Sequence, residues 1–250
     1  MPYGLYMAAE GAQVQSQILE VLSNNIANVE TAGFKRDLAV AQARHSESIE
    51  RGLTPPGSRG IDDIGGGVLT RETTTQFAPG PLQVTGNRTD LAIDGDGFFQ
   101  VKKGDETFLT RAGNFRIDND GQLITQTGHQ VLDSGGGPLV LDPSLNWDVD
   151  NRGRIIQGGA PIGQFALVKP ESLGDLVKVG DTMFSALSDV TPVAPRERNV
   201  RSGYLELSGV KPTQEMMELI KTSRAFEANV KMIQTHDDMI GSLLSRVLAK

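Results

Sequence analysis

The two ends of this chain share one hydrophobic pattern, and the residues between them follow another. Apolar residues recur at alternating intervals of three and four from Leu5 to Val29, and again from Met216 to Val247. This spacing places about one residue per turn on a single stripe of a helix, which is the stripe that coiled coils bury against a partner. Long helices with such stripes at both ends indicate assembly rather than catalysis.

The residues between the helical ends predict short strands. Turns rich in Asp and Gly alternate with apolar runs, as where Asp94–Gly97 separates Leu91–Ile93 from Phe98–Val101. Strands at such spacings are typical of antiparallel β structure. The expected fold is therefore a mainly β central domain of antiparallel hairpins, with long N- and C-terminal α-helices as coiled-coil-like assembly elements.

Four parts of the chain are expected from these patterns. They are an N-terminal assembly helix over 1–36, a linker or extended arm over 37–80, a β-rich domain over 81–203, and a C-terminal assembly helix over 204–250. The first helix is expected over residues 4–30.

The ends of both helices carry recognisable signals. Gly33 suits a left-handed cap after the first helix, and Pro212 is preorganised for the first turn of the second, which is expected to run to about Leu248. Glu215 and Glu218 lie in its first two turns, where negative charge complements the helix dipole.

The arm is the least regular part. Residues 37–49 could extend a helix or run irregularly, whereas Val68–Phe77 alternates loosely and is a candidate strand or extended arm. Thr54–Gly57 and Gly65–Gly67 are typical of loops. We therefore expect residues 45–67 to be mobile in the isolated protein.

Composition excludes several functions. The net charge of −7 leaves no basic field for nucleic acid or an anionic membrane. Without cysteine there can be no disulfide, thiolate metal site or cysteine nucleophile, and the three histidines are far apart. No apolar run is long enough to span a bilayer, and the first basic residue is Lys35, which argues against a secretory signal. No cofactor, nucleic acid or small-molecule substrate is expected.

Several short motifs have plainer explanations. Asp94–Gly97, Asp118–Gly121 and Asp148–Asn151 could suggest calcium, but the twelfth position counted from Asp118 is His129 instead of the glutamate of a calcium loop. Hairpin turns explain them better. The Gly-rich segments lack the Gly-Lys-Ser/Thr of a phosphate loop, and Asn87–Thr89 matches a glycosylation sequon of only three residues.

Asp237 falls on the stripe of the last helix. It could set the register of a helical assembly, but a partly wet inner face is the favoured explanation. The two terminal helices could also pair within one chain, although an isolated pair would be only marginally stable. Their exposed stripes would otherwise be interaction surfaces, ordered on assembly.

Four segments resemble those of bacterial flagellar rod and hook proteins. Ser23–Arg36 resembles their N-terminal signature, an Asn-Asn-Leu-Ala-Asn core followed by Thr-x-Gly-Phe/Tyr-Lys/Arg, with Ile26 in place of the usual Leu. Asp90–Val101 and Phe108–Thr125 resemble the central motif and the block after it, and Arg224–Asn229 resembles the C-terminal helix signature. The resemblance extends from end to end.

The resemblance is to the FlgF/FlgG family of basal-body rod proteins. Ser208–Pro212 departs from the Ser-Asn-Val-Asn that many relatives carry there. The chain length, Gly163–Pro170 and Val179–Phe184 are more similar to the proximal rod members, FlgF, than to the distal rod members, FlgG. The hook protein is generally longer.

The resemblance implies a structural subunit of the periplasm-spanning rod, part of the drive shaft for motility. It also implies export by the flagellar type III apparatus without a cleaved signal, and self-association and assembly with other rod and hook subunits. The terminal helices would form the inner tube, with the β domain outside. The expected assembly interface is Leu5, Leu19, Leu22, Asn24, Asn25, Ile26, Asn28, Val29, Gly33, Phe34, Leu219, Phe226, Val230, Ile233, Ile240 and Leu244.

A different class of function also fits a β-rich chain. A carbohydrate-active enzyme would need two positioned carboxylates, but the prominent aspartates of this sequence all fall in expected turns. A free-standing binding module is the other alternative. Deleting both helices separates these possibilities, because an enzyme or a binding module would keep its activity.

Overall fold

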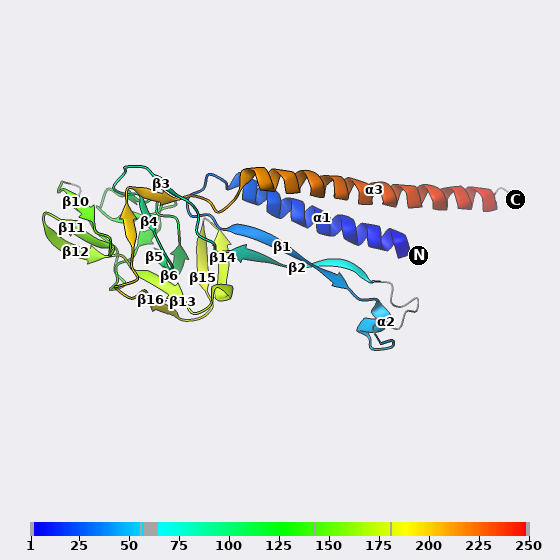
Figure 1. Cartoon of the computed structure of the whole chain (residues 1–250), viewed down its shortest axis with the longest axis horizontal. Coiled ribbons are helices and arrows are strands. Elements are labelled where there is room, and N and C mark those ends of the chain that lie inside the picture. The colour runs from blue at the N-terminus through cyan, green and yellow to red at the C-terminus, as the bar shows by residue number, and fades with distance from the viewer. Residues whose placement is uncertain (1–2, 56, 58–64, 143, 181, 249–250) are drawn as a thin grey trace. The chain divides into compact units, whose positions relative to one another are not determined.

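The computed structural model describes residues 3–55, 57, 65–142, 144–180 and 182–248, and the chain divides into two compact units. The helical unit consists of Met1–Ala27, Asp37–Gln76 and Lys211–Lys250. The β unit consists of Asn28–Arg36 and Phe77–Val210. Each unit therefore combines segments that are distant in the sequence (Figure 1).

The helical unit is built from two long helices and a two-stranded sheet. Helix α1 contacts both α3 and strand β2, and β1 pairs with β2. The elements are α1 (Tyr3–Ala27), β1 (Arg36–Arg44), α2 (Glu47–Glu50), β2 (Gly67–Gln76) and α3 (Pro212–Leu248).

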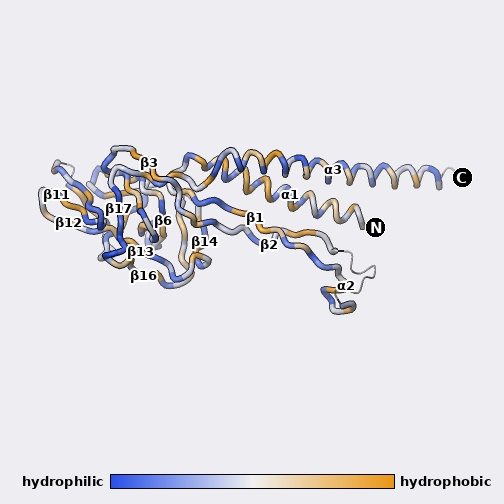
Figure 2. The backbone as a smooth tube through the Cα atoms, in the orientation of Figure 1, coloured by the Kyte–Doolittle hydropathy of each residue, from blue (hydrophilic) through white to orange (hydrophobic). Residues whose placement is uncertain are grey.

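Helix α3 follows its sequence signals closely. It begins at Pro212 as expected, with Glu215 in its first turn and Arg246 in its last, both of favourable sign for the helix dipole. Apolar and polar residues interleave along its length (Figure 2). No helix of the described ranges is long and apolar enough to cross a membrane.

Helix α1 ends earlier than expected. Its last residue is Ala27, and Gly33 lies beyond it with a φ of +67°. Gly33 therefore adopts the expected left-handed conformation, but its N–H donates to the carbonyl of Glu206 at 2.8 Å instead of capping the helix. The cause is a tertiary contact, because Glu206, which is distant in the sequence, accepts this hydrogen bond.

The arm is more regular than expected. Residues 37–49 form most of strand β1 and the start of α2 rather than a helix extension or an irregular segment, because β1 gains a partner in β2. The strand expected over Val68–Phe77 is confirmed as β2. Part of the segment expected to be mobile, namely residues 56 and 58–64, lies outside the described residues.

The β unit contains one large sheet and several small ones, with antiparallel pairing at every ladder that joins its strands. The nine-stranded sheet runs β14-β15-β6-β5-β9-β8-β7, with β13 on β5 and β16 on β13; β10-β11-β12, β17-β4 and β18-β3 form the small sheets. The strands are β3 (Leu82–Val84), β4 (Leu91–Ile93), β5 (Phe98–Lys103), β6 (Glu106–Thr110), β7 (Arg116–Ile117), β8 (Leu123–Ile124), β9 (Gln130–Val131), β10 (Trp147–Val149), β11 (Arg154–Gln157), β12 (Ala160–Gln164), β13 (Leu167–Pro170), β14 (Leu176–Gly180), β15 (Met183–Ala186), β16 (Val190–Pro192), β17 (Val200–Ser202) and β18 (Tyr204–Glu206), and a short 3-10 helix spans Leu173–Asp175.

Two turns behave differently from each other. Asp118–Gly121 joins β7 to its partner β8, as a hairpin should. Asp94–Gly97 also lies between strands, but β4 pairs with β17 and β5 pairs with β6, β9 and β13. The second turn therefore connects two sheets.

The core of the β unit is aromatic and aliphatic. The rings of Phe99, Phe115 and Phe165 lie within 6.3 Å of one another, centre to centre, and their side chains are at most 2 % exposed. Such rings bury large apolar areas and favour edge-to-face or offset packing. The unit therefore has a hydrophobic core of its own.

Candidate assembly interface

Helices α1 and α3 run antiparallel in a fixed register. A Cβ on Gly4 would come within 3.1 Å of Nε2 of His236, and one on Gly11 within 3.0 Å of Nδ2 of Asn229. Nδ2 of Asn25 donates to Oε2 of Glu215 at 3.3 Å. Each step of seven or fourteen residues along α1 is thus matched by an equal step backwards along α3, which is the register of a heptad pairing.

Polar residues recur every seven positions along α3, and three of them, Glu215, Asn229 and His236, approach α1. Glu215 and Thr222 are buried, and Asn229 and His236 are half-buried. Asp237, which the sequence pattern placed on the stripe of α3, is exposed, and its neighbour His236 approaches α1 instead. Polar side chains therefore lie on the face of α3 that meets α1, on a line one residue from Asp237. Gly4 and Gly11 make room for them.

The buried face of α1 is wider than one stripe. Ala8, Ala12 and Leu22 of the expected stripe are buried, and so are Val14 and Asn25 beside it. The cause is that α1 contacts β2 as well as α3. The spacing of three and four describes the stripe that faces one partner helix, so it does not include the residues of α1 that face β2.

Asn25 is the centre of a polar network inside the helical unit. Its side chain is fully buried; it donates to the carbonyl of Asp37 at 2.8 Å and accepts from the N–H of Asp37 at 3.0 Å. The hydroxyl of Thr75 donates to Oδ1 of Asp37 at 2.8 Å. With the bond to Glu215, these contacts join α1, β1, β2 and α3.

The expected interface residues divide between the two units. Those on α1 and α3 lie in the helical unit, whereas Asn28, Val29, Gly33 and Phe34 lie in the β unit. Leu22 and Asn25 are buried and Asn24 and Leu244 are exposed, while the half-buried members of the helical unit are Leu5, Leu19, Ile26, Leu219, Phe226, Val230, Ile233 and Ile240.

The four interface residues of the β unit have local roles. Phe34 is buried, and the ammonium of Lys178 lies 3.8 Å from its ring centre. Oδ1 of Asn28 accepts from the hydroxyl of Thr31 at 3.2 Å, and Val29 is half-buried. Asn25, in the helical unit, bonds across the two helices to Glu215.

Part of α3 continues beyond α1. In the register set by Gly4 and His236, Tyr3 lies opposite residue 237, so residues 238–248 pass the first described residue of α1 (Figure 1). Met239, Leu243 and Leu244 in this extension are 50 %, 62 % and 55 % exposed. Further exposed apolar side chains lie along α3 at Met216, Met217, Ile220 and Met232.

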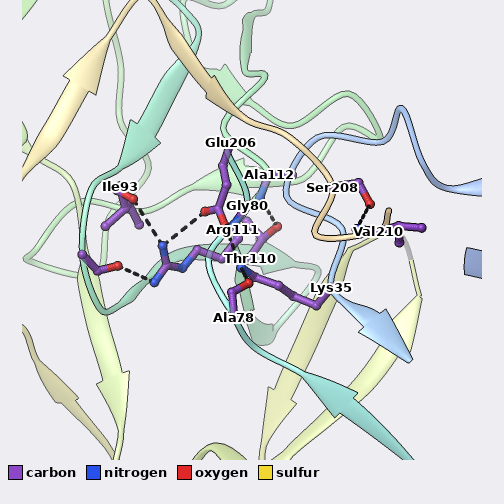
Figure 3. A network of polar contacts seen from close by, with 11 residues as sticks. Lys35, Ala78, Gly80, Ile93, Thr110, Arg111, Ala112, Glu206, Ser208 and Val210 are labelled. Carbon is purple, nitrogen blue, oxygen red and sulfur yellow. Dashed lines mark hydrogen bonds and ion pairs between the residues drawn. The ribbon is translucent and has the colours of Figure 1, made fainter. Parts of the chain in front are cut away.

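A buried charge cluster in the β unit was not expected from the sequence. Nζ of Lys35 lies 2.6 Å from Oε1 of Glu206, and Nη1 of Arg111 lies 3.2 Å from Oε2 of the same carboxylate (Figure 3). Lys35 and Glu206 are 1 % exposed and Arg111 is 6 % exposed. Burial lowers the pKa of Lys35, and the Glu206 carboxylate opposes that shift.

The acidic turn Asp94–Gly97 holds two ion pairs. Oδ2 of Asp94 accepts from Arg201 at 2.5 Å, and Oδ2 of Asp96 accepts from Lys169 at 2.6 Å, which lowers the pKa of Asp96. In the described part of the chain, no cluster of three or more His, Asp or Glu side chains could hold a metal ion. Turn geometry and ion pairing account for these aspartates.

Three family descriptions match successive parts of this chain. They are the flagella basal body rod protein family over residues 5–35, the D1 domain of the flagellar hook protein FlgE/F/G over 92–157, and the C-terminal region of the flagellar basal body rod FlgEFG proteins over 201–246. The first and last cover most of α1 and α3, and the second covers much of the β unit.

Full-length relatives decide the family. The chain is 33 % identical to the flagellar basal-body rod protein FlgF of Caulobacter vibrioides over 99 % of its length and 98 % of the relative. It is 33 % identical to FlgG of Bacillus subtilis over 96 % and 97 %, and 32 % identical to FlgG of Agrobacterium fabrum over 98 % of each. This chain belongs to the FlgF/FlgG family of flagellar basal-body rod proteins.

A member of this family is a structural subunit of the flagellar basal-body rod. The family is not enzymatic, so the carbohydrate-active alternative is set aside. Family membership also places the chain among proteins that assemble with other rod subunits.

Proposed function

We propose that this rod subunit polymerises through α1 and α3 with copies of itself and with other rod and hook subunits. The supporting observation is the exposure of large apolar side chains on α3, from Met216 at 52 % to Leu244 at 55 %. Exposed apolar surface of this kind marks interaction sites. Burying it at about 25 cal/mol per Å2 offsets the entropy of ordering the helices.

Leu244 offers a sharp test of this proposal. Because its side chain is exposed, Leu244→Lys should leave the isolated protein folded while it places a charge on the assembly surface. We expect the variant to be missing from purified basal bodies. Gln234→Lys, at an exposed polar position of the same helix, is the matched control and should be incorporated. Normal incorporation of the Leu244 variant, with wild-type melting of both proteins, would refute the proposal.

The proximal position in the rod is the second part of the proposal. The alignment to FlgF of Caulobacter vibrioides takes 249 residues for 99 % of the chain, whereas that to FlgG of Bacillus subtilis takes 261 residues for 96 %. The FlgF alignment therefore needs fewer insertions at the same identity. Crosslinking in intact basal bodies tests the position, because a proximal subunit should be recovered with proximal rod partners and not with the hook.

Export through the flagellar type III apparatus without cleavage is the third part. Its support is the membership of the chain in the FlgF/FlgG family of flagellar basal-body rod proteins. The intact mass of the protein recovered from rods should correspond to an uncleaved N-terminus. A shortened mass would contradict this route.

A further inference from the structure

The chain crosses between the helical unit and the β unit after residues 27, 36, 76 and 210, and the β-unit residues beside the last three crossings contact one another. We call them the exit segments: residues 33–36, 77–80 and 206–210, each beside a boundary between the units. They are distant in the sequence, and all three contribute to the buried charge cluster (Figure 3).

The carboxylate of Glu206, in one exit segment, accepts hydrogen bonds from the other two. Its Oε1 accepts from Nζ of Lys35 at 2.6 Å and from the N–H of Gly80 at 2.9 Å. The same Lys35 ammonium donates to the carbonyl of Ala78 at 3.0 Å. One acid and one base therefore bond to each other and to the backbone of the third segment.

Backbone contacts bring the same segments together. Gly33 donates to the carbonyl of Glu206 at 2.8 Å, and Gly209 donates to the carbonyl of Phe34 at 3.1 Å. A Cβ on Gly80 would come within 2.0 Å of the carbonyl oxygen of Leu207. The segments are in direct contact, with no space between them for a side chain at Gly80.

Arg111 ties this cluster to the rest of the β unit. Its guanidinium donates to Glu206 and also to the carbonyls of Ile93 at 3.3 Å and Gly95 at 2.7 Å. Arg111 follows β6, and Ile93 ends β4, so the cluster is bonded to strands of two sheets. The exit segments are thereby held to the folded body.

Buried charges make these contacts interdependent. A charge-assisted hydrogen bond is stronger than a neutral one, and removal of one partner of a buried pair leaves the other charge uncompensated. If Lys35 or Glu206 moved away alone, the other would lose its nearest charged partner, and departure of residues 77–80 would remove a backbone hydrogen bond from each of them. The segments should therefore hold their places together or lose them together.

We propose that Glu206 is a positioning residue that couples the three exit segments, and that this coupling is required for motility once the subunit is assembled in the rod. The second half rests on the proposed function. The first half concerns the isolated protein and can be tested without a flagellum.

Hydrogen–deuterium exchange of the purified full chain tests the coupling. Glu206→Gln keeps the shape of the side chain and removes its charge, and Lys35→Met keeps the aliphatic packing and removes the ammonium. In each variant we expect exchange to rise at least about tenfold in all three exit segments. Peptides over β5 and β6 should exchange as in the wild type.

Asp150→Asn is the matched control. Asp150 accepts from Arg154 at 2.7 Å, which is a comparable acid–base hydrogen bond in a turn of the same unit. Its loss should affect only that turn. Faster exchange confined to the segment that bears each substitution would overturn the coupling, and so would global exchange in both cluster variants, because the cluster would then serve general stability.

Swarming in soft agar tests the second half. Cells that carry Glu206→Gln as their only copy should swarm at less than half the wild-type rate, although the variant is present in basal bodies. Wild-type swarming by such cells would overturn the second half. Absence of even the wild-type protein from rods would instead refute the proposed function, so the two failures are distinguishable.

Discussion

The side-chain amide of Asn25 donates to a carboxylate oxygen of Glu215 across the two long helices, 3.3 Å away. Both side chains are buried, and Asn25 also exchanges two hydrogen bonds with the backbone of Asp37. A buried polar pair at one end of a helix pair fixes which residues lie opposite each other. The register of α1 on α3 is thus set by polar contacts, with apolar residues on either side.

Asn25→Ala should destabilise the protein by about 1–3 kcal/mol. The substitution leaves the backbone N–H of Asp37 and the Glu215 carboxylate without this amide, and a buried polar group that loses its partner costs about that much. Denaturant unfolding monitored by circular dichroism measures the change. Gln17→Ala, an exposed amide on the same helix, should shift stability by less than about 0.5 kcal/mol. Equal effects of the two would contradict the role of Asn25.

Gly33→Ala should destabilise the protein more than Gly104→Ala does. Both residues have a left-handed φ, +67° and +64°, which costs a residue other than glycine about 1–3 kcal/mol. A Cβ on Gly33 would also lie 2.4 Å from the backbone nitrogen of Ala112, whereas nothing lies within 4 Å at Gly104. The difference between the two melting shifts therefore measures the close approach. Identical shifts would show that the backbone relaxes freely at Gly33.

Gly11→Ala should stabilise the wild-type protein less than it stabilises the Asn229→Ala variant. Alanine gains up to about 1 kcal/mol over glycine inside a helix, but its Cβ would press on the Asn229 amide at 3.0 Å. A double-mutant cycle should give a coupling of at least about 0.5 kcal/mol. Gly241→Ala in α3, with nothing within 4 Å, serves as the control and shows the helix preference alone. Additive effects would contradict the close contact.

The stability that Lys35 confers should rise with pH on the alkaline side. Burial lowers the pKa of Lys35 in the folded protein below its usual 10.5. Between the lowered value and 10.5 the unfolded chain binds the proton more strongly than the folded chain does, so the free energy of unfolding increases with pH in that window.

Denaturant unfolding between pH 8 and pH 10.5 measures this effect. The difference between wild type and Lys35→Met should grow as pH rises, because methionine does not titrate. Lys103→Met removes an exposed lysine and should give a difference that stays constant. If the difference in unfolding free energy between wild type and Lys35→Met fell as pH rose, the pKa of Lys35 would have to be raised by folding rather than lowered.

Within α3, trypsin should cut first in the extension beyond α1. Arg246 lies beyond the described start of α1, whereas Lys231 lies in the paired part of the helix, and both are exposed. Cleavage after Arg246 should be at least about tenfold faster, because only local fraying is needed there. Mass spectrometry of the fragments distinguishes the sites. Rapid joint loss of residues 1–65 and 205–250 would mean that the helix pair opens in the free subunit.

Sequence alone determined the local features of this protein. The spacing of three and four from Leu5 and from Met216, together with Pro212, predicted two long terminal helices, because helix periodicity and end signals depend on neighbours within one or two turns. The Asp118–Gly121 hairpin followed for the same reason. The signature around Asn24 and Asn25 also predicted the family, which the full-length relatives confirm.

Only the tertiary structure decided the long-range relationships. It paired β4 with β17 instead of β5, turned residues 37–44 into a strand of a two-stranded sheet, and brought Lys35 and Arg111 to one carboxylate of Glu206. A strand edge or a lysine has many possible partners along a chain, and its own neighbours do not say which one folding will supply. Burial of a shared core makes that choice, since it alone brings distant segments close enough to bond.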